Sequence, residues 1–68
     1  MFIDFAGMMI NINYIISIYK TTYETIAHNT FFEVNIRLYP ANTVIKEGYH
    51  TRKEQETRFA ELVAEINE

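Results

Sequence analysis

Cysteine and tryptophan are absent from this chain of 68 residues, which also contains only one proline and two glycines. The lack of cysteine excludes a disulfide framework and a thiolate zinc site. The glycines are isolated, so the glycine-rich loops that cradle phosphate groups are excluded as well. A chain of this length forms one domain at most.

Basic residues are also few, since six Lys and Arg stand against nine Asp and Glu and give a formal net charge of -3. This balance excludes a strongly basic nucleic-acid footprint for the whole chain, although it leaves room for a local basic patch. Hydrophobic residues make up 49% and charged residues 22%, which is typical of a folded domain. Because so short a chain buries little apolar area, we expect self-association or partner binding to add stability.

The first ten residues are apolar but match neither a secretory signal nor a membrane span. A secretory signal requires a basic segment at its start, and residues 1–10 contain no basic residue. A membrane span requires an uninterrupted apolar run, and Asp4, Asn11 and Asn13 interrupt this one. We therefore expect a cytoplasmic chain that does not enter a membrane. Residues 1–10 are interpreted either as a short element packed on the core or as an extension ahead of the folded domain.

Three later segments are rich in β-branched and aromatic residues that alternate with polar ones, which predicts the strands 11–20, 31–39 and 43–47. Strand propensity after the first segment continues as far as Ile26. Turns are expected at 27–30, with Asn29 at positive φ, and at 40–43, where Pro40 cannot donate to a ladder. Gly48 is expected to end the third strand.

The alternation predicts which side chains face the core. In the second strand these are Phe32, Val34, Ile36 and Leu38, and in the first they are Ile12, Tyr14, Ile16 and Ile18. A tight turn between the strands would set Thr22 and Glu24 against this apolar row. A bulge near Tyr19 and Lys20 would remove the conflict by turning Tyr19, Thr21 and Tyr23 inward.

A helix is predicted for residues 52–67, where no Gly or Pro interrupts the chain. Thr51 and Glu54 form a capping-box pattern at its start, and Glu54 is spaced for an ion pair with Arg58. Its apolar stripe consists of Phe59, Leu62, Val63 and Ile66. The predicted fold class is therefore α+β, with a three-stranded antiparallel β-meander packed against one C-terminal α-helix in a single domain over residues 11–68.

No arrangement of residues indicates catalysis. Ser17 lies within a strand without a base placed beside it, and His28 and His50 are read as surface or capping residues. Glu47, His50 and Glu54 are close in sequence but do not match a metal-binding spacing. We therefore expect a non-enzymatic protein without metal or cofactor.

Three groups of surface residues remain as candidate binding sites. The acidic end of the helix and the outward face of the second strand are predicted to contact a protein partner; these residues are Glu61, Glu65, Glu68, Glu33, Asn35, Arg37 and Tyr39. The start of the helix is a candidate anion site formed by His50, Arg52 and Lys53.

In its size and composition the chain resembles the small acidic inhibitor proteins that phages make against host defences, such as anti-CRISPR proteins. That resemblance implies a mechanism in which carboxylates occupy a basic, nucleic-acid-handling surface of a larger host protein. One alternative is a nucleic-acid-binding module that uses tyrosines with Lys20, Arg37, Lys46, Arg52 and Lys53. Another is a self-assembling structural subunit, because a three-stranded meander leaves two free strand edges.

Overall fold

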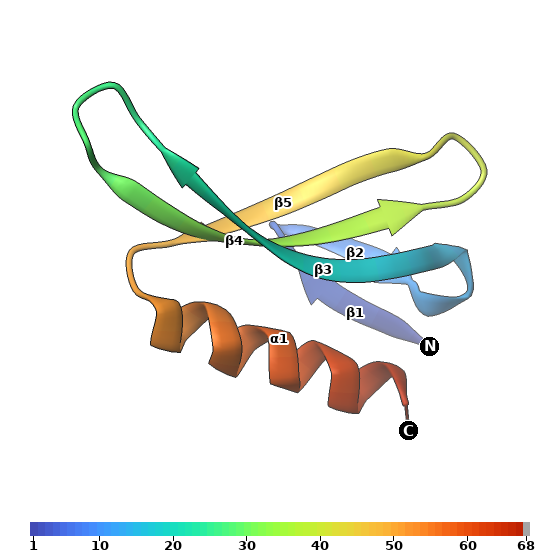
Figure 1. The fold of residues 1–68 in the computed structure, drawn as a ribbon. Helices are drawn as coiled ribbons and strands as arrows, with labels where there is room; N and C mark the ends of the chain where they lie inside the picture. Colours follow the sequence, from blue (N-terminus) through green and yellow to red (C-terminus); the bar gives the residue numbers. More distant parts are fainter. Residues whose placement is uncertain (68) are drawn as a thin grey trace.

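A computed structural model describes residues 1–67 (Figure 1). Three strands form an antiparallel sheet in the order β3-β4-β5, and two more form a separate antiparallel pair. The elements are β1 (Phe2–Phe5), β2 (Met8–Asn11), the 3-10 turn η1 (Ile12–Tyr14), β3 (Ile15–Glu24), β4 (Thr30–Leu38), β5 (Thr43–Tyr49) and α1 (Arg52–Ile66). The predicted α+β fold, a three-stranded antiparallel sheet packed against one C-terminal helix, is confirmed.

The N-terminal residues form the β1–β2 hairpin. Ala6 and Gly7 make its two-residue turn and have φ values of 52° and 75°. A two-residue turn with positive φ at both positions has a backbone twist that matches the twist of the two strands it connects. The hairpin packs into the core through Ile3, Phe5 and Ile10, which are at most 5% exposed. Of the two interpretations of residues 1–10, the structure therefore shows the short packed element.

The first long strand begins later than predicted. The chain turns through η1 before β3 starts at Ile15, and the register shifts between Ile15 and Ser17. This bulge leaves Ile16 as the additional residue, 48% exposed, and places Ile15 and Ile18 among the residues packed on the core. Of the predicted inward row, Ile12 and Ile18 pack on the core, whereas Tyr14 and Ile16 are exposed, because η1 and the bulge interrupt the alternation.

The bulge near Tyr19 and Lys20, which the sequence left open, does not form; the register shift lies between Ile15 and Ser17 instead. Tyr19 pairs with Asn35 and Thr21 with Glu33 in an unbroken register, so both stay on the outer face of the sheet. The residues that seemed to require a bulge, Thr22 and Glu24, are exposed on the inner side. They can be polar because the β3–β4 hairpin extends past the start of α1 (Figure 1).

Two further details of the meander differ from the prediction. In the β3–β4 turn His28 has the positive φ, 64°, instead of Asn29. The last strand continues through Gly48 to Tyr49, because Gly48 keeps its pairing with Glu33. The turn predicted at 40–43 lies between β4 and β5, and the Tyr39–Pro40 peptide bond within it is cis.

The helix begins as its sequence indicates. The Thr51 hydroxyl accepts a hydrogen bond from the Glu54 amide at 3.2 Å and donates to the Glu54 carboxylate at 2.9 Å. Gln55, only 3% exposed, ties the first turn to the sheet by donating to the carbonyls of Thr21 and Glu33 at 3.0 and 2.8 Å. Leu62 is fully buried further along the helix.

The core lies between the inner face of the three-stranded sheet and two covering elements. Val34 and Ile36 on β4 are fully buried, as the alternation of that strand predicts. The helix and the β1–β2 hairpin both lie on this side of the sheet (Figure 1). Within residues 1–67, neither element covers the opposite, outer face of the sheet (Figure 1).

Candidate functional site

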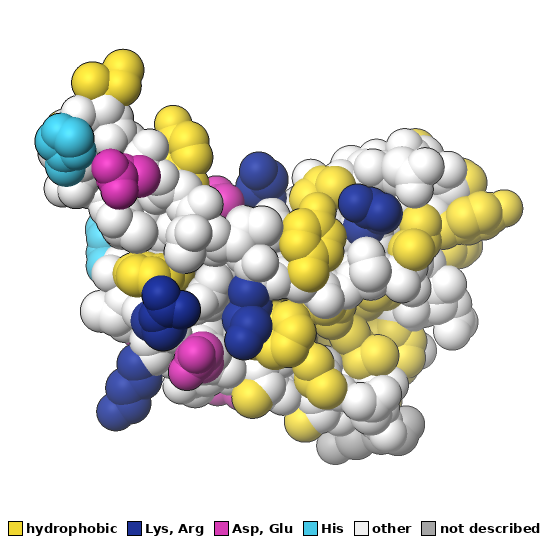
Figure 2. Space-filling view, viewed as in Figure 1, with side chains coloured by type: hydrophobic (Ala, Val, Ile, Leu, Met, Phe, Trp, Pro, Cys, Tyr) yellow, Lys and Arg dark blue, Asp and Glu magenta, His cyan; other side chains and the backbone are white. Residues whose placement is uncertain are grey.

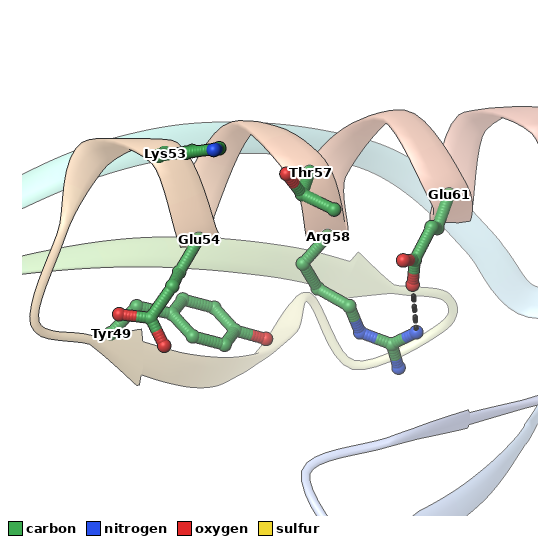
Figure 3. Close-up of a pocket in the computed structure, with 6 residues that line it drawn as sticks. All are labelled: Tyr49, Lys53, Glu54, Thr57, Arg58 and Glu61. Atoms are coloured by element: carbon green, nitrogen blue, oxygen red, sulfur yellow. Dashed lines mark ion pairs between the residues drawn. The ribbon is translucent and has the colours of Figure 1, made fainter.

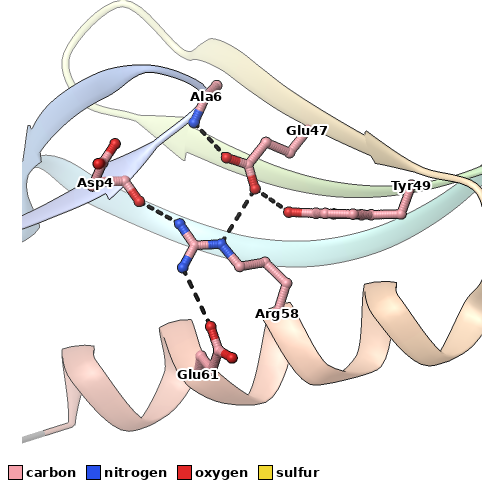
Figure 4. A network of polar contacts seen from close by, with 6 residues as sticks. All are labelled: Asp4, Ala6, Glu47, Tyr49, Arg58 and Glu61. Atoms are coloured by element: carbon pink, nitrogen blue, oxygen red, sulfur yellow. Dashed lines mark hydrogen bonds and ion pairs between the residues drawn. The ribbon is translucent and has the colours of Figure 1, made fainter.

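A polar cluster joins the helix, the sheet and the N-terminal hairpin (Figure 4). Arg58 Nε on α1 donates to Glu47 Oε1 on β5 at 3.3 Å, and the Arg58 guanidinium also donates to the Asp4 carbonyl. Glu47 Oε2 accepts from the Ala6 amide at 2.6 Å, and its Oε1 accepts from the Tyr49 hydroxyl. One carboxylate thus receives donors from three separate elements, which fixes their relative positions.

The cluster shifts the ionisation of its members. Burial acts to raise the pKa of Glu47, but hydrogen bonds from Tyr49, Ala6 and Arg58 outweigh it and lower the pKa below 4.5. Burial, together with the hydrogen bond to Glu47, raises the pKa of Tyr49 to about 12. Burial acts to lower the pKa of Arg58, yet the neighbouring Glu47 raises it. The cluster therefore holds one carboxylate, one guanidinium and one neutral phenol at pH 7.

A groove of about 300 Å³ lies beside this cluster, between α1 and the end of β5 (Figure 3). The helix supplies most of its wall from successive turns, and the ring of Tyr49 closes the side toward the sheet. The lining residues are Tyr49, Lys53, Glu54, Thr57, Arg58 and Glu61. The groove therefore combines an aromatic surface with charged groups along a helix.

The charge of the groove follows from how its cations and carboxylates are paired. Arg58 lies 3.3 Å from Glu47 and 3.6 Å from Glu61, so its charge is shared between two carboxylates. The expected Arg58 pair with Glu54 is thereby replaced by these two contacts. Glu61 is 57% exposed, and Glu54 and Glu65 are exposed along the same helix. Lys53 also lines the groove, so its lining carries two cations and two carboxylates, and the exposed Glu65 adds a third carboxylate on this side of the helix.

The sequence had placed its acidic surface at the end of the helix. Glu61 and Glu65 lie there and are exposed, whereas Glu68 is outside the described residues. The sequence does not indicate the groove, because no local pattern marks Tyr49 and Glu47 stands out only by its closeness in sequence to His50 and Glu54. A salt-bridge partner for Arg58 on a strand cannot be read from helical spacing.

The outer sheet face holds the other predicted contact residues. The Asn35 side chain is buried, at 1% exposure, and donates to the Tyr19 carbonyl at 3.3 Å and to Thr21 Oγ1 at 2.8 Å. Thr21 in turn donates to Glu33 at 3.0 Å, so Asn35 and Glu33 hold the sheet face together. The guanidinium of Arg37, an exposed residue, lies 5.8 Å from the centre of the Tyr19 ring.

Tyr39, the last of those predicted contacts, is 64% exposed in the turn that follows β4. It is therefore displaced from the row formed by Glu33, Asn35 and Arg37. The predicted contact surface therefore has two parts. Glu33 and Asn35 form hydrogen bonds within the sheet, whereas Arg37 and Tyr39 are exposed.

The basic residues do not form one continuous patch on the visible face (Figure 2). Lys20 lies over the Phe59 ring at 5.0 Å and Arg52 over the Phe32 ring at 5.3 Å, both on the helix side of the sheet. Arg37 and Lys46 occupy the outer face instead. Arg37 and Asn35 alternate along β4 with the buried Val34 and Ile36, and Lys46 on β5 pairs with Asn35. The basic set of the nucleic-acid alternative is thus split between the two sides of the sheet.

The candidate anion site at the start of the helix is likewise dispersed. The His50 ring lies 5.4 Å from the Phe31 ring, while Arg52 covers Phe32. Lys53 lines the groove between α1 and β5. These three side chains contact different neighbours and do not converge on one point.

Comparison with known proteins found no matching family model, no matching curated protein and no matching solved structure. Within residues 1–67 there is no group of three or more His, Asp or Glu side chains placed to bind a metal ion. Over the same residues, no helix has the length and apolar character needed to cross a membrane.

Proposed function

We propose that this chain is a small non-enzymatic protein that binds a basic surface of a larger protein and inhibits it. The observation that supports this function is the groove between α1 and β5. Glu54 and Glu61 contribute carboxylates to its wall, and Tyr49 contributes an aromatic ring (Figure 3). An aromatic surface flanked by carboxylates is complementary to an arginine or lysine side chain.

The groove would receive such a side chain in a defined way. The aliphatic stem lies against the Tyr49 ring, and the charged head group lies between Glu54 and Glu61 on the exposed helix surface. Arginine gains more than lysine, because its planar guanidinium forms bidentate bonds with a carboxylate and stacks on an aromatic ring. Glu65, one turn beyond Glu61, extends the acidic surface toward a second basic residue of the partner.

Binding to a surface with several arginines would inhibit the partner if that surface is the one that binds nucleic acid. Proteins that handle nucleic acids use such surfaces to bind phosphates. Carboxylates seated on that surface exclude the nucleic acid by charge and by bulk. This is the mechanism implied by the resemblance of the chain, in size and composition alone, to phage-encoded anti-CRISPR-type inhibitors, and we propose it for a cytoplasmic host partner.

Fluorescence anisotropy with two labelled probes tests this function. We expect an arginine-rich peptide to bind with an affinity that falls as salt is raised, and a single-stranded oligonucleotide not to bind. The double variant E54Q/E61Q should lose most of the peptide affinity. The control E24Q/E56Q makes the same change in net charge at exposed positions outside the groove.

Two results would count against the groove. If E24Q/E56Q weakens peptide binding as much as E54Q/E61Q does, the interaction reports only net charge. If the oligonucleotide binds more tightly than the peptide, the nucleic-acid-binding alternative is favoured. Inhibition itself is then tested by adding the chain to the partner's complex with nucleic acid, which wild type should dissociate and E54Q/E61Q should not.

A further inference from the structure

The free edge of β3 is the longest unpaired strand edge in the described part of the chain. β3 spans ten residues and pairs with β4 along one side, while no strand within residues 1–67 pairs with its other side. No proline protects this edge, and Lys20 and Glu24 are its only charged residues. Such an edge presents unpaired backbone donors and acceptors to another strand.

We propose that two copies of this chain associate through β3, in antiparallel pairing about a two-fold axis at Thr22. The two three-stranded sheets then form one continuous sheet of six strands. This interaction lies at the edge opposite to β5, so it is separate from the groove and does not depend on the proposed inhibitory function. The occupant of the edge is therefore a second copy of the same strand.

The charges of β3 select this register. In antiparallel pairing about Thr22, Lys20 of each copy lies opposite Glu24 of the other, because both are two residues from the axis. The dimer thus contains two equivalent ion pairs between directly opposed side chains. Registers centred on Lys20 or on Glu24 place like charges opposite each other, and registers centred on Thr21 or Tyr23 pair neither charge.

The side chains that form these pairs are accessible. Lys20 and Thr22 are exposed, and the Glu24 side chain is 63% exposed, with His28 Nδ1 at 3.4 Å as its neighbour. All three even-numbered residues project to the same side of the sheet, so opposed pairs meet on one face. In the single chain Lys20 Nζ lies 5.0 Å from the centre of the Phe59 ring, so the proposed ion pair requires this exposed side chain to turn toward the edge.

The same register accounts for an exposed apolar residue. Ile26, at the tip of the β3–β4 hairpin, is 100% exposed, and the tip protrudes from the rest of the molecule (Figures 1 and 2). Continuing the pairing about Thr22 brings Ile26 beside Ile18 of the second copy. Ile18 is only partly buried in the single chain, so each apolar side chain covers the other.

Sedimentation velocity over a range of concentrations tests the pairing. Wild type should be dimeric, and the single variants K20E and E24K should each raise the dimer dissociation constant by roughly tenfold or more, because they oppose like charges twice. The double variant K20E/E24K should restore wild-type association. Lys20 and Glu24 are about 13 Å apart along one strand, so they cannot pair within a chain and rescue must arise between chains.

Matched controls separate this contact from net charge and from folding. K46E and E56K make the same charge changes at exposed positions away from β3 and should leave the dissociation constant unchanged. Far-UV circular dichroism establishes that each variant is folded. E54Q/E61Q should also dimerise like wild type. The peptide-binding measurement therefore tests the groove, and the dimer dissociation constant tests the β3 contact, independently of each other.

Because the chain contains no cysteine, a single introduced cysteine gives an independent measure of the register. The T22C variant places two thiols opposite each other on the axis, at a Cα separation suited to a disulfide. Under mild oxidation T22C should form a covalent dimer much faster than T43C, which carries its thiol at the exposed start of β5.

A wild-type chain that remains monomeric at millimolar concentration would overturn the proposal. So would a dimer in which K20E/E24K fails to recover association, or in which T22C cross-links no faster than T43C. Dimerisation with both charge rescue and rapid T22C cross-linking would establish the edge and its register.

Discussion

Glu47 and Arg58 lie 3.3 Å apart, on β5 and α1, and their side chains are 24% and 22% exposed. The contact joins the helix to the sheet, and the additional bonds from Arg58 to Asp4 and from Ala6 to Glu47 bring the N-terminal hairpin into the same cluster. Among residues 1–67, six hydrophobic side chains are buried in the core, and this polar junction adds contacts that link the helix, the sheet and the hairpin.

Removing either partner should destabilise the chain. We expect Glu47→Gln and Arg58→Met each to lower the free energy of unfolding by roughly 2 kcal/mol, since each breaks several charge-assisted hydrogen bonds. Urea unfolding followed by circular dichroism measures the change. Glu65→Gln, which alters an exposed carboxylate on the same helix, should differ little from wild type. Equal stability of Glu47→Gln and Glu65→Gln would contradict a stabilising role for the cluster.

Glu47 should also determine part of the stability at acid pH. Its pKa is lower in the folded chain than its ordinary value of 4.5, so its contribution is present above that value. The contribution is lost as the pH falls from 4.5 through the lowered folded pKa. Midpoints of thermal unfolding from pH 7 to pH 2 should therefore decline less for Glu47→Gln than for wild type. Parallel curves for the two proteins would argue against this linkage.

Tyr49 should govern stability at alkaline pH, with the opposite sign. Its folded pKa of about 12 is above its ordinary value of 10, so its contribution is complete below pH 10 and disappears as the pH rises toward 12. Tyr49→Phe lacks the titrating hydroxyl and should show a shallower alkaline loss. Ultraviolet absorbance of tyrosinate, compared between the two proteins, should show that the component missing from Tyr49→Phe titrates near pH 12.

The turn at Ala6 offers a stabilising change. Ala6 has a φ of 52°, a conformation that disfavours alanine and that asparagine tolerates, and Gly7 follows it. Ala6→Asn creates the Asn-Gly pair preferred in this type of hairpin turn and keeps the amide that donates to Glu47. We expect a gain of about 0.5 kcal/mol in the free energy of unfolding. Ala60→Asn, in the exposed helix, should be destabilising instead.

Local patterns predicted several elements well because their causes are local. The helix follows from the Thr51 cap and from an apolar stripe that contains the buried Leu62. The inward face of β4 follows from simple alternation, which the structure keeps at Val34 and Ile36. Neither feature depends on what the neighbouring elements do.

The errors lie where an element depends on distant parts of the chain. The bulge near Ile16 cannot be placed from β3 alone, because it is defined by the register in which β3 pairs with β4. Asn35 reads as a solvent-facing residue in the alternation, yet Thr21 and the Tyr19 carbonyl bind its side chain within the sheet. The groove was missed because its residues come from both β5 and α1.

By itself, the sequence determined the α+β class, the order of the three-stranded meander and the helix, and the apolar faces of β4 and α1, since backbone preference, capping and alternation act over a few residues. Only the tertiary structure decided which charges meet. The pairing of Glu47 with Arg58 and the exposure of the β3 edge arise when segments far apart in sequence pack against one sheet, and no local pattern encodes those distances.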